Sequence, residues 1–341
     1  MSLPTRKIGT DSVSCIGFGM MGLSAYYGPV KPDEERFKVL DAAYESGCTF
    51  WDTSDAYGDS EELIGKWFKR TGKRNEIFLA SKFAFRSGAD AEKPFAIDGS
   101  PEWARQAIDL SLKRLGVDQI DLWYLHRPDA NVPIELTVGA MSEAVKAGKV
   151  KYLGISECSA ATLRRAHAVH PMAAAQFEYA PFTLGVEDPR IGIRDACKEL
   201  GITLIAYSPL GRGLLTGKLD PETLSDNDMR KMLNYPRFRR ENFALVLQLV
   251  DTIGAIGARH GATAAQVALA WLLAQGPDVI PIPGTTNVGR VHENAKAANI
   301  TLTPEEVKEI RDAVERAGLH TVLRVPEAFE SYNYVDTPPL Q

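Results

Sequence analysis

Eight short apolar runs alternate with longer helical patterns along the chain. Each run is rich in β-branched, aromatic or small apolar residues, and the runs begin at Val13, Cys48, Glu76, Gln119, Lys149, Ala173, Ile202 and Asp278. Strands that are apolar on both faces are typical of a parallel sheet covered by helices, and eight β-then-α units are the number that closes a barrel. We therefore predict an α/β chain folded as a (β/α)8 TIM barrel.

The helical segments carry boundary signals, and two regions exceed the eight units. Ser100 and Pro101 mark a helix start, and Gly116 ends the same pattern. Residues 210–242 are poorly periodic and lead into one added helix; a second follows Thr303, which has Glu306 at capping-box spacing. We expect an N-terminal β-hairpin, extra C-terminal helices, and a single domain over residues 1–341 that ends in a polar tail at about residues 320–341.

Charge and cysteine content bound the function. The 341 residues include 39 basic and 44 acidic side chains, a net charge of −5, which argues against a nucleic-acid or anionic-membrane surface. Neither a signal-like apolar region at the start nor an apolar stretch of membrane-spanning length is found, so we expect a cytoplasmic protein without a membrane partner. The cysteines show no metal-ligand spacing and are expected to be buried thiols: Cys15, Cys48, Cys158 and Cys197.

One glycine motif imitates a dinucleotide-binding turn. Gly17, Gly19 and Gly22 spell G-x-G-x-x-G after an apolar run. In a Rossmann fold the last glycine opens a helix at once, whereas here Pro29 follows and no helix is expected before about Asp33. We interpret these small residues instead as positions where the backbone passes close to a neighbour at the barrel mouth.

Four polar residues stand at or just after the carboxyl ends of successive strands, where barrel active sites lie. They are Asp52, Tyr57, Lys82 and His126. Free tyrosine has a pKa of about 10, and a nearby ammonium lowers it, so Lys82 held by Asp52 could make Tyr57 a proton donor. His126 could orient a carbonyl by a hydrogen bond. The set therefore predicts carbonyl reduction, which needs an acid and a hydride donor.

Several segments around these residues resemble the signature segments of the aldo-keto reductase superfamily. They are WDTSDAYG, SKF, LHRPD and YSPLGRGLLTGK, in order over nearly the whole chain, and the subfamily resembled is the fungal YakC-type and plant perakine-reductase-type group. The resemblance implies an NADPH-dependent oxidoreductase that reduces an aldehyde or ketone to an alcohol, with Tyr57 as proton donor. The other five histidines are expected to have surface or structural roles, and no metal is expected.

The resemblance also implies a cofactor site. Ser156 and Gln176 match the carboxamide contacts, Tyr207 the ring that stacks on the nicotinamide, and Arg290 the clamp on the 2′-phosphate. The full set of implied NADPH/NADP+ contacts is Gly19, Met20, Asp52, Ser156, Gln176, Tyr207, Ser208, Leu210, Arg212, Lys218, Gly284, Thr286, Arg290, Glu293 and Asn294.

Two positions depart from the family pattern. Glu157 stands where many relatives carry Asn, which removes one expected carboxamide contact. Gly284 stands where mammalian-type members have Lys, so NADPH preference would depend mainly on Arg290.

Loops above the catalytic residues should form the pocket for a small-molecule carbonyl substrate. The candidates are mostly apolar or aromatic: Met21, Tyr26, Ala56, Phe83, Phe85 and Arg127. Xenobiotic aldehydes, pyridoxal and natural-product ketones all suit such a lining, while Tyr26 and Arg127 would also suit a polar or anionic group. The tail from Arg324 onward could cover this site or another subunit.

Two other functions use the same residues. One is a cofactor-binding regulatory subunit, which also retains the four polar residues; here only about a dozen residues precede the first run, so no inactivating N-terminal segment is expected. The other is an isomerase or aldolase with Lys82 as a Schiff base, which would require an unpaired Lys82. Asp52 argues against that chemistry.

Overall fold

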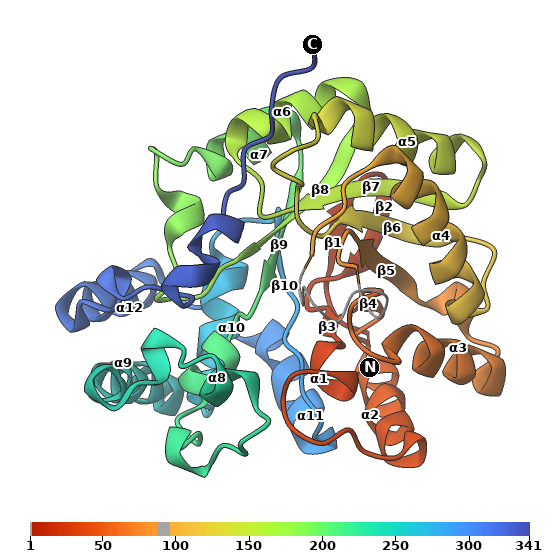
Figure 1. The fold of residues 1–341 in the computed structure, drawn as a ribbon. Coiled ribbons are helices and arrows are strands. Elements are labelled where there is room, and N and C mark those ends of the chain that lie inside the picture. Colours follow the sequence, from red (N-terminus) through yellow and green to blue (C-terminus); the bar gives the residue numbers. More distant parts are fainter. Residues whose placement is uncertain (1, 87–95) are drawn as a thin grey trace.

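The eight parallel strands form a closed barrel in the computed structural model, which describes residues 2–86 and 96–341 (Figure 1). Neighbouring strands follow chain order. They are β3 (Phe18–Gly19), β4 (Phe50–Asp52), β5 (Phe78–Phe83), β6 (Ile120–Leu125), β7 (Val150–Ser156), β8 (Met172–Glu178), β9 (Thr203–Tyr207) and β10 (Val279–Pro281). The last strand returns to the first through a Gly19–Gly284 bridge and the Gly17 N–H, which donates to the Pro281 carbonyl at 3.0 Å. This confirms the predicted (β/α)8 fold.

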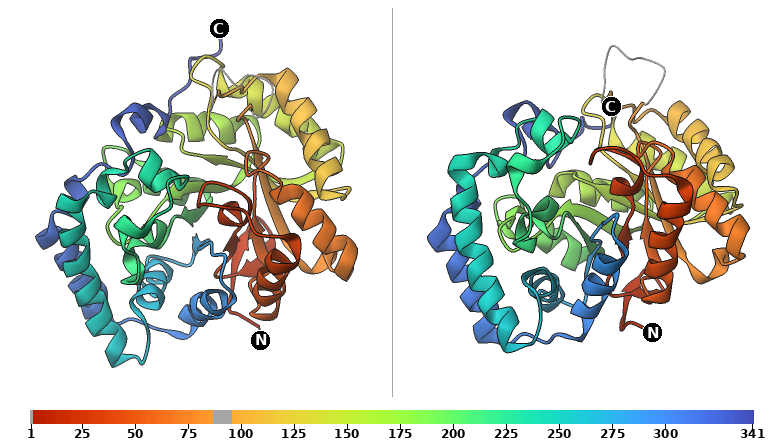
Figure 2. Two further views of the ribbon diagram at one scale, coloured as in Figure 1. Left: turned by 60° about the horizontal axis from the view of Figure 1, so that its bottom comes forward. Right: turned by 90° about the horizontal axis from the view of Figure 1, so that it is seen from below.

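A ring of helices surrounds the strands, as the two turned views in Figure 2 show. The ring consists of α2 (Asp33–Glu45), α3 (Ser60–Thr71), α4 (Pro101–Leu115), α5 (Ile134–Lys146), α6 (Ala160–Val169), α7 (Ile193–Leu200), α10 (Ala264–Ala274) and α11 (Val288–Lys296). The predicted ends of α4 are confirmed: the Ser100 hydroxyl accepts the Trp103 N–H at 3.2 Å, and Gly116 has a φ of 64°.

An N-terminal hairpin closes the amino end of the barrel. Strands β1 (Thr5–Ile8) and β2 (Asp11–Ser14) pair antiparallel, and Ile8 and Val13 pack into the barrel interior beside Phe50. The Arg6 guanidinium donates to the carbonyls of Leu273 (2.6 Å) and Gly276 (2.7 Å), at the end of α10.

Two expectations near the N-terminus were wrong. The run from Val13 is not one strand, because Val13 and Ser14 belong to the hairpin and only Phe18–Gly19 joins the barrel. A one-turn helix, α1 (Met21–Ser24), also precedes Asp33, although no helix was expected there. Gly17 explains the close approach at this turn, since a Cβ there would lie 2.7 Å from the Phe50 ring and 2.8 Å from Ile282.

Further helices come from the segments beyond the eight units. Helix α9 (Arg240–Arg259) packs against α12 (Pro304–Ala317), whose Thr303–Glu306 capping box is present as predicted. The poorly periodic stretch before α9 forms short turns. The short elements are η1 (Arg74–Glu76), η2 (Gly185–Glu187), η3 (Gly211–Thr216), η4 (Pro221–Thr223), α8 (Met229–Met232), η5 (Pro236–Phe238), η6 (Ala297–Asn299), η7 (Leu319–Thr321) and η8 (Glu327–Tyr332).

The C-terminal segment packs on the barrel rather than extending from it. The Val335 N–H donates to the Glu157 carbonyl, and the Ser159 N–H donates to the Val335 carbonyl, both at 2.8 Å. The four cysteines are buried and free, as predicted. Within residues 2–86 and 96–341, none of the helices has the length and apolarity that crossing a membrane requires.

Candidate active site

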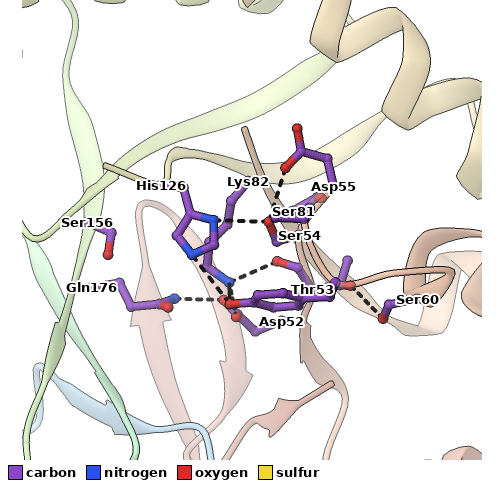
Figure 3. A network of polar contacts seen from close by, with 12 residues as sticks. Asp52, Thr53, Ser54, Asp55, Ser60, Ser81, Lys82, His126, Ser156 and Gln176 are labelled. Atoms are coloured by element: carbon purple, nitrogen blue, oxygen red, sulfur yellow. Dashed lines mark hydrogen bonds and ion pairs between the residues drawn. The ribbon is translucent and has the colours of Figure 1, made fainter. Parts of the chain in front are cut away.

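Three strand ends bring the four predicted catalytic residues together. Asp52 ends β4, Lys82 lies in β5, and His126 follows β6; Figure 3 shows these side chains directed toward one another. The Lys82 ammonium donates to a carboxylate oxygen of Asp52 and lies 3.4 Å from the Tyr57 hydroxyl. That hydroxyl is also 3.5 Å from Nε2 of His126. The sequence prediction of one cluster therefore agrees with the geometry.

The turn that carries Tyr57 depends on a glycine. Gly58 has a φ of 56°, in the left-handed region, and a Cβ there would lie 2.6 Å from the Ser24 carbonyl oxygen. The Tyr57 N–H donates to the Ser54 carbonyl at 3.2 Å. This tight turn returns the Tyr57 ring over Lys82, whose ammonium lies 5.0 Å from the ring centroid.

Further hydrogen bonds hold the Asp52–Lys82 pair. Gln176 of β8 donates to the second carboxylate oxygen of Asp52 at 2.8 Å, and Lys82 also donates to the Thr53 carbonyl at 2.8 Å (Figure 3). All four groups are buried, so each charged atom relies on these partners for compensation. A Lys82 ammonium with these acceptors is not the unpaired amine that Schiff-base chemistry needs.

The expected lowering of the Tyr57 pKa does not occur. Burial raises the pKa of this hydroxyl, and the Asp52 carboxylate raises it further, while Arg127 alone among the principal influences lowers it. The physical reason is that Lys82 does not act as an isolated cation. Burial lowers the pKa of Lys82 and raises the pKa of Asp52, so the pair stays neutral as a unit. Tyr57 therefore keeps its proton at neutral pH.

His126 is uncharged at neutral pH. Burial, followed by the charges of Lys82 and Arg127, places the pKa of this imidazole well below its usual value. Its Nδ1 lies 3.0 Å from the Ser54 hydroxyl, and its ring contacts the Phe85 ring edge-on with centroids 4.8 Å apart. A neutral imidazole can present one N–H to a carbonyl oxygen beside Tyr57 without adding charge.

A cavity of about 420 Å³ opens above these groups. Asp52, Tyr57 and His126 lie in its wall, and it extends to the start of α11. Every cofactor contact implied by the family resemblance also lines it. These residues are Gly19, Met20, Asp52, Ser156, Gln176, Tyr207, Ser208, Leu210, Arg212, Lys218, Gly284, Thr286, Arg290, Glu293 and Asn294.

Comparison with known proteins agrees with this geometry. Residues 15–315 match the model of the aldo/keto reductase family. The chain belongs to the aldo/keto reductase family. Members of this family are oxidoreductases that use nicotinamide cofactors.

Several relatives are similar over nearly their whole length. Aldo-keto reductase str7 of Strobilurus tenacellus is 55% identical over 325 residues, 94% of each chain. Aldo-keto reductase yakc [NADP(+)] of Schizosaccharomyces pombe is 48% identical over 100% of this chain and 99% of its own. Among solved structures, the glycerol dehydrogenase of Gluconobacter oxydans has a TM-score of 0.83 at 28% identity, covering 93% of this chain and 97% of its own.

The side chains of this aldo/keto reductase suit a nicotinamide dinucleotide. The inner end of the cavity offers amide and hydroxyl groups from Gln176 and Ser156 beside the ring of Tyr207. The outer end offers the exposed cations Lys218 and Arg290, which suit phosphates. Amide and hydroxyl groups at the inner end suit a carboxamide, and the cations at the outer end suit phosphates. The inner end also carries a cation, Arg127, whose guanidinium lies 3.1 Å from the Ser156 hydroxyl.

One predicted pocket residue is wrong. Met21, Tyr26, Ala56, Phe85 and Arg127 line the cavity, but Phe83 does not lie among the described lining residues. Phe83 follows Lys82 directly in β5, and successive side chains of a strand point to opposite faces. Because Lys82 points into the barrel, Phe83 points outward, where it stacks on Trp123 with ring centroids 4.3 Å apart.

One wall of the cavity consists of residues that were not expected from the sequence. Tyr27, Met229, Arg230 and Tyr235 line it; the last three come from the poorly periodic stretch before α9. A Tyr27–Asp228 bridge joins this stretch to the loop after α1. Periodicity could not place these residues, and their only signal is a concentration of aromatic and basic side chains in a long loop.

Glu157 does not line the cavity, although it stands at the position where many relatives carry an Asn that would contact the carboxamide. It is fully buried behind Tyr207 and pairs with Arg324 of the C-terminal segment. Burial alone would raise the pKa of Glu157, but Arg324 and Arg127 lower it to about 2. The carboxylate is therefore charged at neutral pH.

Proposed function

We propose that this aldo/keto reductase catalyses the NADPH-dependent reduction of an aldehyde or ketone to an alcohol, with Tyr57 as the proton donor. The Tyr57 hydroxyl carries the proposal. It lies in the cavity wall within 3.5 Å of both the Lys82 ammonium and the His126 imidazole, and burial keeps it protonated. An acid at this position can protonate an oxygen as negative charge develops on it.

Each neighbour of Tyr57 has a separate role in the proposal. Bound NADPH would supply the hydride. His126 would orient the carbonyl oxygen by a hydrogen bond, and Tyr57 would give its proton to the same oxygen. Lys82, held by Asp52, would stabilise the tyrosinate that remains until it takes a proton from solvent.

NADPH is proposed over NADH because of the outer end of the cavity. Arg290 and Thr286 stand at the start of α11, where backbone N–H groups and the helix dipole favour an anion such as a 2′-phosphate. The printed name of the Schizosaccharomyces pombe relative, which specifies NADP(+), supports the same preference.

The substrate pocket favours small, mainly apolar carbonyl compounds. Tyr26 meets Tyr57 edge-on with ring centroids 6.5 Å apart, and Met21, Ala56 and Phe85 add apolar surface beside the reacting position. Aromatic aldehydes fit this lining best, because offset and edge contacts with aromatic rings are available on two sides.

The test is product formation with isotopic labelling. The chain is mixed with NADPH deuterated at the transferable C4 position and with 4-nitrobenzaldehyde or pyridoxal, and the alcohol is analysed by mass spectrometry. The proposal predicts one deuterium on the carbinol carbon and one NADP+ formed per alcohol. Tight NADPH binding with no labelled alcohol from either aldehyde would instead indicate a regulatory, non-catalytic protein.

A further inference from the structure

Glu157 occupies an unusual position at the end of β7. Its φ is 53°, in the left-handed region that a glutamate seldom adopts, and its side chain is fully buried. One carboxylate oxygen accepts the Tyr207 hydroxyl at 2.9 Å and the Glu178 N–H at 3.1 Å. Its backbone N–H donates to the Gln176 carbonyl at 3.2 Å. A single residue thus contacts two residues that line the inner end of the cavity.

The charge of Glu157 is balanced by the C-terminal segment, defined here as residues 322–338. Arg324 of this segment donates to both carboxylate oxygens of Glu157, one at 2.9 Å. The Arg324 guanidinium also lies 4.9 Å from the centre of the Tyr334 ring. In Figure 1 the dark blue C-terminal segment runs past α7 and α6, where Arg165 holds it by the Thr337 and Pro338 carbonyls at 2.8 and 2.6 Å.

Tyr207 connects this ion pair to the cavity. The Tyr207 side chain lines the cavity, whereas Glu157 and Arg324 are absent from the lining formed by the described residues. The Tyr207 hydroxyl is held by Glu157 on one side and lies 3.5 Å from the Arg127 guanidinium on the other. A change in the charge balance behind Tyr207 would therefore alter both the direction of this ring and the potential at the inner end of the cavity.

We propose that Glu157 and Arg324 are positioning residues of the nicotinamide end of the site. Through Arg324, the C-terminal segment holds the Glu157 carboxylate on the Tyr207 hydroxyl and cancels its charge. This proposal rests on the proposed function, because it concerns the ring that Tyr207 would face. The oxidised nicotinamide ring is a cation and the reduced ring is neutral. Because the Glu157–Arg324 pair stays neutral as a unit, the pair itself does not favour either redox form by its charge.

The experiment measures the dissociation constants of NADP+ and NADPH by titration calorimetry at about pH 8. The variants are Arg324→Met, Glu157→Gln, their double variant, and Arg165→Met. Arg324→Met removes the guanidinium that donates to both oxygens of the Glu157 carboxylate and should strengthen NADP+ relative to NADPH about tenfold. Glu157→Gln leaves an uncompensated guanidinium and should shift the ratio the opposite way. The double variant should return to within about twofold of the wild type.

A control variant and the opposite results distinguish a positioning role of the Glu157–Arg324 pair from a purely structural one. Arg165→Met removes another anchor of the C-terminal segment and should leave the ratio unchanged. A purely structural ion pair would weaken both redox forms equally in both single variants, and that result would overturn the proposal. If Arg324→Met does not fold, Glu157→Gln is compared with the double variant instead. A shift of the ratio toward NADPH relative to the double variant would support the proposal, and the absence of that shift would contradict it. A wild type that binds neither form would contradict the proposed function itself.

Discussion

At the level of single side chains, the surroundings of Tyr57 keep its proton in place at neutral pH. Burial and the Asp52 carboxylate raise the pKa of the hydroxyl, and the neutral Asp52–Lys82 pair offers no isolated cation to counter them. In the proposed reaction, proton release would then depend on the negative charge that develops on the substrate oxygen. In that reaction, Lys82 would stabilise the tyrosinate form of Tyr57 rather than ionise the hydroxyl beforehand.

A chain of three side chains should make turnover depend on pH. The Ser54 hydroxyl lies 3.2 Å from the Asp55 carboxylate and 3.0 Å from Nδ1 of His126. Burial raises the pKa of Asp55 to about 8, and the charge of Glu61 contributes to this increase. Below that pH, Asp55 is protonated and the Ser54 hydroxyl donates its hydrogen bond to Nδ1 of His126. The imidazole then carries its proton on Nε2 and presents that N–H to the pocket. Above it, the carboxylate attracts that hydrogen, so we predict that kcat falls about tenfold as pH rises through about 8.

The control for this pH dependence is Asp55→Asn. The amide cannot ionise, so a profile of kcat against pH should lose its fall near pH 8, while Asp59→Asn in the same loop should retain it. An unchanged profile in Asp55→Asn would assign the fall to another group.

Arg290 should decide the preference for NADPH. It is exposed at the start of α11 and lines the outer end of the cavity. Because hydrogen bonds to charged groups contribute about 1.5–3 kcal/mol, Arg290→Met should raise the KM for NADPH about tenfold or more and leave the KM for NADH nearly unchanged. Equal changes for the two cofactors in steady-state kinetics would place the 2′-phosphate elsewhere.

At the level of elements, the hairpin and the barrel stabilise each other. Ile8 is fully buried against the barrel interior, at the end opposite the candidate site. Ile8→Ala should lower the free energy of unfolding by about 2–4 kcal/mol in urea titrations, since it removes buried methyl groups and leaves a cavity. The kcat of the folded variant should match the wild type. A loss of kcat without a loss of stability would mean that the hairpin influences the chemistry.

Strand ends were predictable from sequence, and the inserted stretch was not. Asp52, Lys82 and His126 interrupt apolar runs, so their positions at one end of the barrel followed from the strand pattern alone. The prediction that Phe83 lines the pocket was wrong because adjacent residues of a strand face opposite sides, and Lys82 already faces the barrel interior. Tyr235 and Met229 lie in turns fixed by tertiary contacts, which leave no periodic signal.

At the level of the whole molecule, the C-terminal segment joins distant parts of the fold. It contacts the end of β7 through Glu157 and helix α6 through Arg165, more than a hundred residues earlier in the chain. The sequence showed only a polar tail with a proline, because its burial depends on partners far away in sequence. The role of Glu157 was likewise not predictable, because its partner Arg324 lies far away in the sequence.

This ion pair should stabilise the fold at neutral pH and not in acid. The folded-state pKa of Glu157, about 2, is below the usual value near 4.3, so its contribution is fully present above about pH 4.5 and is lost as pH falls toward 2. The loss should be on the order of 2 kcal/mol in urea unfolding measured between pH 6 and pH 3. Glu157→Gln should flatten this dependence, and Glu143→Gln, at an exposed ion pair, should not. An unchanged slope in Glu157→Gln would place the acid sensitivity elsewhere.

Tyr57→Phe is the most direct test of the proposal that this chain is a reductase with Tyr57 as its acid. The variant and the wild type are compared by NADPH binding and by NADPH consumption with 4-nitrobenzaldehyde. We expect an NADPH dissociation constant within about twofold of the wild type and a kcat lowered roughly a hundredfold or more, because a general acid is lost. A Tyr57→Phe variant that binds NADPH and reduces the aldehyde at the wild-type rate would contradict it.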